Sequence, residues 1–395
     1  MIIRLIFSQL IAMNFTSPAL RRAMTFTSLL FILAVSGCDN PQSEAKKAAP
    51  AVAAQPDSPA ASVTAHHHDD RPSTGTQNSN EPAQAVTQQN GTLPSANSTI
   101  TGWPRTLQTS QGPLTLQQPP QRIVSTSVTL TGTLLAIGAP LVGSGATARH
   151  TSVADDRGFF TQWSQVATER GLQPLYVSEP NAEAIAAAAP DLIVIAATGG
   201  DSAVKLQEQL TAIAPVLVVD YGDKSWQQLA AELGAATGHE ADAKRISERF
   251  AQRVQQVKQA ITLPPQPVSA LVYYEDGRGI NLWTPASAQG KLLTELGFSL
   301  AMPPAEVHGG SSMGKRNDII QLSGETMAAG ITGQSVLLFA TDDGTVAKVL
   351  SNPFLAALPP VMAQRVWAFG PDTFRLDYYS ASNLLERIEQ RFKTP

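Results

Sequence analysis

The chain has 395 residues, which exceeds the length of one ordinary domain and predicts two packed units with additional segments. Charged residues make up only 15% of the chain, and the formal net charge is −4 at pH 7. Nucleic-acid-binding proteins normally present a basic face, and no run of Lys and Arg here exceeds a pair, so nucleic acid is not expected as a partner.

The amino-terminal segment, residues 1–37, is predicted to be a signal peptide of the lipoprotein type. Arg21 and Arg22 form a basic region, and the apolar run 26–35 behind them is too short to span a bilayer. Small residues then precede Cys38, the only cysteine, in a pattern that resembles a bacterial lipobox. An unmodified Cys38 would be an odd free thiol, which an oxidising compartment disfavours. We therefore expect Cys38 to carry a lipid.

The segment 38–101 is predicted to be a disordered stalk that begins at the lipidated cysteine. Residues 39–101 contain no Phe, Trp or Tyr and are rich in small and polar residues. They cannot bury enough apolar area to offset the entropy lost on ordering. Asp39, directly after the cysteine, resembles the signal that retains lipoproteins at the inner membrane. These features predict a periplasmic domain tethered to the inner membrane of a Gram-negative bacterium.

From Trp103 onward, β-branched runs alternate with Ala-rich stretches, a pattern typical of α/β architecture. Residues 102–239 are predicted to form a first α/β lobe. Its expected strands are 122–125, 141–143, 192–195 and 216–219, and its expected helices are 181–189 and 201–212. Such continuously apolar strands suit a sheet that is covered on both faces.

The longest helical signal, residues 240–262, is predicted to connect this lobe to a second one. Apolar residues recur in it at spacings of three and four and form one stripe: Ile246, Phe250, Val254, Val257 and Ile261. Residues 263–395 then repeat the α/β pattern, with strands at 268–273, 282–284, 336–340 and 366–369 and a final helix at 381–392. We predict two α/β lobes joined by a single helix, a ligand cleft between them, and only small closure.

Two motifs associated with catalysis or metal binding occur in unfavourable contexts. The G-x-S-x-G match at 310–314 lacks the preceding strand and following helix of a serine nucleophile elbow. The triplet 66–68 with its two following Asp residues could hold a divalent metal, but it falls in the stalk. Only His150, His239 and His308 lie in the lobes, so three His converging on one ion is not expected. We predict no enzymatic activity and no metal site.

Cations in loops are the more informative candidates for binding. They are Arg149, Arg157, Lys315, Arg316 and Arg375. Trp283 and Tyr274 end predicted strands, and therefore belong at a sheet rim, where ligands of open α/β folds bind. The pattern alone leaves alternatives open: Trp283 could be a core residue, and Arg375 could pair with Asp372 or Asp377.

Several long runs of residues resemble one family. They are RIVSTSVTLTG at 122–132, VADDRGFFTQWS at 153–164, ATGGDSA at 197–203, KSWQ at 224–227, LPPQPV at 263–268, NLWTPASAQG at 281–290, GKRNDIIQL at 314–322 and TFRLDYYSA at 373–381. On these runs the span from Trp103 to Phe392 resembles the periplasmic ferric enterobactin binding proteins of enteric bacteria. They belong to the helix-linked, class III solute-binding proteins of ABC importers.

The resemblance implies capture of ferric enterobactin or a related ferric catecholate siderophore, and delivery to an inner-membrane ABC permease by a monomeric protein. Three catechols supply six oxygens to the iron, so the protein itself needs no metal ligand and no cofactor. The cargo would be a trianion with three aromatic faces, suited to Arg charges and to an indole ring. A haem or cobalamin capture protein of the same fold is the alternative, followed by a hydrolase.

The resemblance also carries over individual residues. Trp283 and Arg375 match ligand-contacting positions of the family. Where the family has an Arg before the VADD run, this chain has Ser152, and our hypothesis is that Arg149 supplies the missing cation. Further candidates for ligand binding are Tyr274, Lys315 and Arg316.

Docking to the permease in this class resembles a two-point ion pairing, with one glutamate on each lobe. Glu183 fits the first position. The expected position in the second lobe is Thr294, and the candidate beside it, Glu295, would point about 100° further around a helix.

Overall fold

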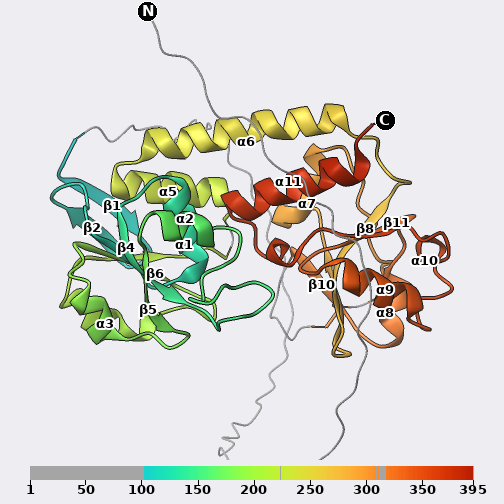
Figure 1. Ribbon diagram of the computed structural model, residues 1–395, viewed down its shortest axis with the longest axis horizontal. Helices are drawn as coiled ribbons and strands as arrows, with labels where there is room; N and C mark the ends of the chain where they lie inside the picture. Colours follow the sequence, from blue (N-terminus) through green and yellow to red (C-terminus); the bar gives the residue numbers. More distant parts are fainter. Residues whose placement is uncertain (1–101, 223, 308, 311–316, 395) are drawn as a thin grey trace, which may run out of the picture. The chain divides into compact units, whose positions relative to one another are not determined.

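The computed structural model describes residues 102–222, 224–307, 309–310 and 317–394, which fall within one compact unit (Figure 1). The predicted signal peptide, Cys38 and the stalk lie outside the described residues, as do Lys315, Arg316 and most of the G-x-S-x-G match. Within the described part of the chain, no helix is long and apolar enough to cross a membrane.

The first lobe is built on a five-stranded, fully parallel sheet. Its strand order is β5-β4-β3-β6-β7. The strands are β3 (Ile123–Ser125), β4 (Leu141–Ala146), β5 (Gln173–Val177), β6 (Leu192–Ala196) and β7 (Val216–Val219). The helices are α1 (Val128–Ala136), α2 (Ser164–Glu169), α3 (Ala182–Ala187), α4 (Gln207–Thr211) and α5 (Trp226–Thr237), with a short 3₁₀ helix η1 (Val204–Leu206) before α4. A separate hairpin, β1 (Arg105–Thr109) and β2 (Gly112–Leu116), precedes them.

The second lobe contains a mixed five-stranded sheet of order β10-β9-β8-β11-β12. Its strands are β8 (Val268–Tyr274), β9 (Gly279–Trp283), β10 (Ile319–Leu322), β11 (Ser335–Leu338) and β12 (Val366–Ala368). Strand β9 is antiparallel to both of its neighbours, and the other pairs are parallel. The helices are α7 (Ala288–Glu295), α8 (Glu325–Gly330), α9 (Asp343–Ser351), α10 (Pro359–Met362) and α11 (Tyr378–Phe392), with the 3₁₀ helix η2 (Pro371–Thr373) before α11.

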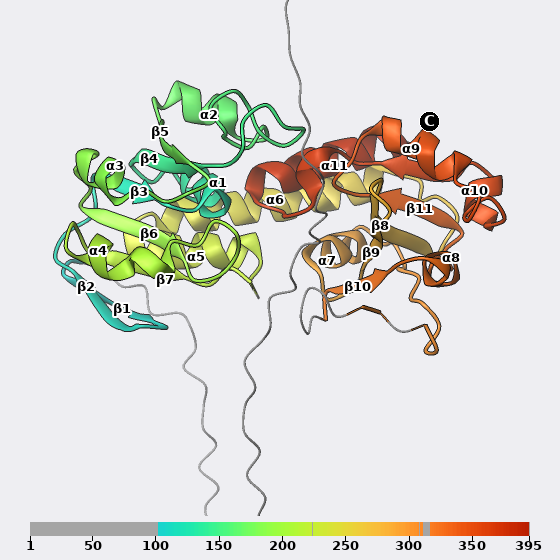
Figure 2. The ribbon, with the colours of Figure 1, turned by 90° about the horizontal axis from the view of Figure 1, so that it is seen from below.

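Helix α6 (Glu240–Ala260) joins the lobes and lies along α5 of the first lobe and α11 of the second (Figures 1 and 2). Its predicted stripe is buried as far as Val257. Phe250 meets the Trp226 ring of α5 edge-on at 5.1 Å between centroids, and Arg253 forms an ion pair with Glu389 of α11. One apolar core cluster therefore runs through residues of both lobes and of α6.

The predicted two-lobed α/β fold with one connecting helix is confirmed, but several elements differ from expectation. The long helix ends at Ala260, because Ile261 is extended and pairs with Lys393 as an isolated bridge. The helix expected at 201–212 is only η1 and α4. The edge strand β5 carries Pro174 and is only partly buried, so no apolar run marked it.

Candidate functional site

A cavity of about 1070 Å³ is lined by side chains of both lobes. The first lobe contributes the start of α1, the segment before α2, and the loops after β6 and β7. The second lobe contributes the end of β9, the start of α7, the residues before β10, and the segment between η2 and α11. This cavity, called the cleft below, is where groups from distant parts of the sequence converge.

In the first lobe, sheet topology brings the lining residues together. Strands β3, β6 and β7 are parallel neighbours, so the segments that follow them emerge at one edge of the sheet. They place Thr129, Gly199 and Tyr221 in the lining. Helix α1 starts at the N-cap Ser127, whose Oγ accepts the N–H of Leu130. This cap fixes the first residue of α1, and therefore the position of Thr129 in the cleft lining.

In the second lobe, Trp283 lines the cleft although only 3% of its surface is exposed to solvent. Its ring packs edge-on against Phe374 at 5.5 Å between centroids. Its indole Nε1 makes no hydrogen bond to any described residue. The two expectations for Trp283 are therefore both partly correct: it packs in the core and also lines the cleft, with an unused donor.

Arg375 lines the cleft and forms no ion pair with a described residue. The candidate partner Asp372 instead accepts hydrogen bonds from Arg387 at 2.5 Å and Asn383 at 2.9 Å. Asp377 caps α11. The Arg375 guanidinium carbon lies 4.3 Å from the centre of the Tyr221 ring of the other lobe. The positive charge of Arg375 is thus left available to a ligand.

Two further cations in the cleft, Lys224 and Lys291, were not predicted. Lys224 lies between β7 and α5, where its Nζ donates to the Asp220 carbonyl at 2.7 Å and lies 3.3 Å from Glu232. Lys291 is exposed on α7. A signal for Lys224 was present, because it opens the KSWQ run in the loop that follows the predicted strand 216–219. With Arg375, the cleft gathers three cations from three elements.

An acidic group lies behind the cleft wall. Asp201 accepts hydrogen bonds from the Tyr221 hydroxyl at 2.8 Å, the Ser127 hydroxyl at 2.5 Å and the Thr129 N–H at 3.0 Å. Burial is the largest effect on its pKa and raises it, but the hydrogen bonds together leave the pKa below its usual value. Burial and the neighbouring Asp201 raise the pKa of Tyr221 to about 12. Near neutral pH, Asp201 is ionised and Tyr221 is a neutral phenol.

Comparison with known proteins assigns the chain to a family. A family profile described as periplasmic binding protein matches residues 123–373. The chain is 54% identical over 290 residues to the ferric enterobactin-binding periplasmic protein FepB of Escherichia coli O6:H1 strain CFT073, an alignment that covers 73% of this chain and 91% of that protein. This chain belongs to the periplasmic binding protein family. The membership predicted from the sequence runs is confirmed.

Solved structures agree with the family assignment. The crystal structure of holo-ViuP matches with a TM-score of 0.66 and 34% identity, covering 74% of this chain and 96% of that one. The crystal structure of Staphylococcus aureus SirA complexed with staphyloferrin B matches with a TM-score of 0.56 and 18% identity, covering 73% and 98%. At that identity, the second likeness concerns the fold alone.

Not all predicted binding residues of this periplasmic binding protein reach the cleft. Trp283 and Arg375 line it, whereas Tyr274, Arg149 and Ser152 are absent from its lining. The Tyr274 hydroxyl accepts a hydrogen bond from Asn281 at 2.8 Å, and its ring lies under Arg278. Arg149 and Ser152 are exposed in the loop after β4. Position along the sequence did not reveal where these loop residues lie in space.

The two predicted docking glutamates occupy unlike positions in the two lobes. Glu183 is exposed in the first turn of α3, which leads from the edge strand β5 to β6. In the second lobe, the helix that leads from the edge strand β10 to β11 is α8, which begins at Glu325. Glu295 instead ends α7. Figure 1 shows α3 and α8 on the side away from α6.

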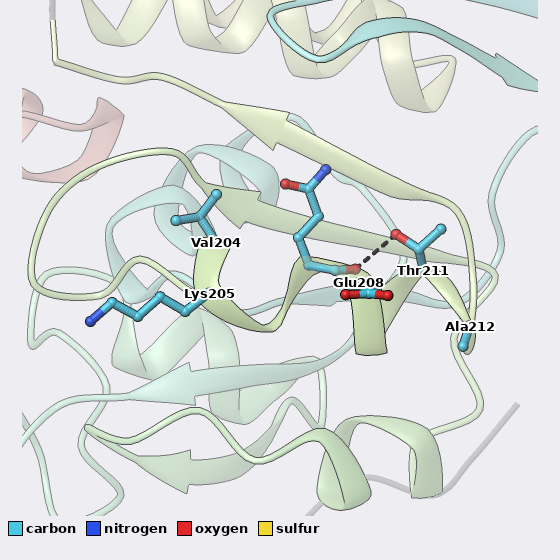
Figure 3. Close-up of a pocket in the computed structure, with 6 residues that line it drawn as sticks. Val204, Lys205, Glu208, Thr211 and Ala212 are labelled. Atoms are coloured by element: carbon cyan, nitrogen blue, oxygen red, sulfur yellow. Dashed lines mark hydrogen bonds between the residues drawn. The ribbon is translucent and has the colours of Figure 1, made fainter.

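A second hollow lies on the first lobe, at η1 and α4 (Figure 3). All its lining residues fall between Val204 and Ala212. One internal hydrogen bond is the 2.8 Å contact from the Thr211 hydroxyl to the Gln207 carbonyl. Because one short segment supplies the entire lining, no groups from separate elements converge there, and the cleft remains the candidate site. Within the described residues, no cluster of three or more His, Cys, Asp or Glu could hold a metal ion.

Proposed function

We propose that this periplasmic binding protein captures ferric enterobactin or a related ferric catecholate siderophore and delivers it to an inner-membrane ABC permease for iron uptake. The observation that carries the proposal is the combination, in one cleft, of the Trp283 indole and of Arg375, which forms no ion pair with a described residue. The 54% identity to a ferric enterobactin-binding protein supports this choice of cargo.

The charge of the cleft suits a trianionic cargo. Arg375, Lys224 and Lys291 lie in its lining, together with the acidic residues Asp318 and Asp377. Asp377 is buried, and its raised pKa reduces its negative charge relative to an ordinary carboxyl. A cation about 6.5 Å from a unit negative charge gains roughly 2.5 kcal/mol at an effective dielectric constant near 20, before desolvation. Arg375 and Lys291, neither of which pairs with an acidic group among the described residues, therefore attract a tris-catecholate, while the charge of Lys224 is partly offset by Glu232.

Aromatic residues of the cleft suit the catechol rings. Trp283 and Phe374 stand on the second lobe, and Phe160, Tyr221 and Trp226 on the first. A catechol ring between such walls gains offset-stacked or edge-to-face contacts. The indole N–H of Trp283 is buried and has no hydrogen-bond partner among the described residues. The iron enters as cargo that is already saturated by catechol oxygens, so the capture itself requires no catalysis and no metal ligand from the chain.

For delivery, we assign the docking contacts to Glu183 on α3 and Glu325 on α8, in place of Glu295. The assignment follows from topology, because α3 and α8 occupy the same place in their respective lobes. A monomer tethered through lipidated Cys38 to the inner membrane completes the proposed arrangement. The tether would hold the captured siderophore close to the permease.

Tryptophan fluorescence tests the proposed cargo. Ferric enterobactin, titrated into the purified protein, should quench the emission of Trp283 in a saturable way. A ferric hydroxamate or haem should give no saturable quenching at the same concentrations. Arg375→Ala should weaken the binding of ferric enterobactin at least tenfold, because it removes an unpaired cation from the cleft. Arg278→Ala, which removes an arginine outside the cleft, is the matched control. Saturable binding of haem with no response to ferric enterobactin would refute the proposal.

A further inference from the structure

Arg375 is held from the opposite lobe. Its guanidinium carbon lies 4.3 Å from the centre of the Tyr221 ring, which belongs to the first lobe and is only 5% exposed. A guanidinium over the face of an aromatic ring is attracted by the ring quadrupole, and the attraction grows as water is excluded. Arg375, which has no acidic partner among the described residues, therefore has a fixed support.

The support is itself anchored. Tyr221 donates its hydroxyl proton to Asp201, and Asp201 also receives the Ser127 hydroxyl and the Thr129 N–H at the start of α1. The amino end of a helix carries a partial positive charge, so an ionised carboxylate is favoured there. Asp201 does not line the cleft. It lies one layer behind Tyr221, so Tyr221 rather than Asp201 faces a ligand in the cleft.

Gly199 makes room for this arrangement. A Cβ at position 199 would lie 1.8 Å from the Tyr221 hydroxyl oxygen, and the residue has a φ of +95°, which L side chains rarely adopt. Any other residue would push the phenol away from Asp201. A phenol that donates to a carboxylate is polarised, and its ring face becomes richer in electrons and more attractive to a cation.

We propose that Tyr221, anchored by Asp201, is a positioning residue for Arg375 in siderophore binding. It holds the guanidinium in the cleft before the ligand arrives, so the ordering of a long, flexible side chain is completed in advance. The first lobe thereby strengthens a ligand contact that the second lobe makes. This role rests on the proposed function, since Arg375 must contact the siderophore for it to operate.

A double-mutant cycle separates positioning from direct contact. Tyr221→Leu removes the ring and should weaken ferric enterobactin binding about tenfold. In the Arg375→Ala background the same change should cause no further loss, because there is no guanidinium left to position. Tyr221→Phe and Asp201→Asn keep the ring and should each weaken binding by about threefold. Tyr273→Phe is the matched control, since its hydroxyl pairs with Asn352 outside the cleft.

Equal losses from Tyr221→Leu in both backgrounds would mean that Tyr221 contacts the ligand itself, and would overturn the proposal. So would unchanged affinity of Tyr221→Leu in the presence of Arg375. Tyr221→Phe keeps the test open if the Leu variant fails to fold, since an affinity equal to that of wild type would also overturn it.

A readout without ligand distinguishes this inference from the proposed function. In ¹⁵N-labelled protein, the Arg375 Nε–H signal should be shifted by the Tyr221 ring current, and Tyr221→Leu should abolish that shift. An unshifted signal in the wild type would overturn the positioning role. A wild-type protein with the shifted signal that binds no ferric catecholate would instead refute the proposed function alone.

Discussion

Asp377 acts at the contact between the two lobes. Its carboxylate accepts the Ser380 N–H at 2.8 Å, which caps α11, and the Gln162 amide of the first lobe at 3.2 Å. The residue is buried, and burial raises its pKa more than these hydrogen bonds lower it. A single side chain thus combines a helix cap, a contact between lobes and a carboxyl group whose pKa is raised by burial.

The raised pKa of Asp377 predicts how stability depends on pH. A carboxyl whose pKa is higher in the folded state stabilises the fold fully below its unfolded pKa of about 4, and this contribution is lost as pH rises through the folded pKa. Asp377→Asn keeps a side-chain oxygen that accepts the capping hydrogen bond of α11. Because the amide does not titrate, the variant should not lose this stability as pH rises. Urea unfolding should show the variant gaining stability relative to the wild type as pH rises from 4 towards 8.

Asp156→Asn, at an exposed carboxyl, serves as the control and should follow the wild type across the same pH range. A stability difference between Asp377→Asn and the wild type that is the same at every pH would contradict the assigned shift.

At the scale of elements, helices α1 and α11 come together because residue 132 is glycine. A Cβ there would lie 2.6 Å from the Asp377 Oδ2 and 2.8 Å from the Trp163 Cδ1. Both neighbours are buried, so neither can move aside freely. The absence of one methyl group therefore permits the contact between a first-lobe helix and the amino end of a second-lobe helix.

The equivalent placement of α3 and α8 predicts which glutamates support uptake. Charge reversal at Glu183 or Glu325 should reduce ferric enterobactin uptake by cells several-fold without changing the affinity of the purified protein. Glu295→Lys, on α7, is the matched control and should leave uptake unchanged. Uptake assays with radioactive iron, paired with fluorescence titrations, measure the two quantities. Full uptake by the Glu325→Lys strain together with impaired uptake by the Glu295→Lys strain would restore the original assignment.

At the scale of the whole molecule, a core cluster continuous through both lobes and α6 links them more firmly than one helix would. Packed apolar contacts do not deform continuously, so opening the cleft widely would expose core residues such as Phe250 and Leu384. This agrees with the expectation of small closure. It favours a cleft largely formed before the ligand binds.

The predicted lipid anchor on Cys38 should affect how much iron the whole protein helps to import. A Cys38→Ser variant supplied with a cleavable signal peptide should bind ferric enterobactin as tightly as the wild type. It should import less iron when the siderophore is scarce, because its local concentration beside the permease falls. Metabolic labelling with palmitate, followed by uptake at limiting and saturating siderophore, measures both points. Equal uptake at limiting siderophore would show that tethering does not limit import.

Local pattern was sufficient for much of the architecture. The stripe from Ile246 to Val257 predicted α6, because helix periodicity is a property of neighbouring residues. The alternation of apolar runs with Ala-rich stretches predicted the α/β lobes, and strands such as β7 were predicted at their observed bounds. Edge strand β5 and the hairpin before the first lobe were missed, because partly exposed strands lack a continuous apolar run.

By itself the sequence determined the two-lobed α/β organisation, the connecting helix and the family, and it singled out Trp283 and Arg375. Only the tertiary structure decided which residues meet. It placed Lys224 and Lys291 in the cleft, left Arg149 and Tyr274 out of the lining, and set Arg375 over Tyr221. Periodicity and motifs record local interactions, whereas the partner of a side chain across a cleft depends on strand order and on the packing of the two lobes.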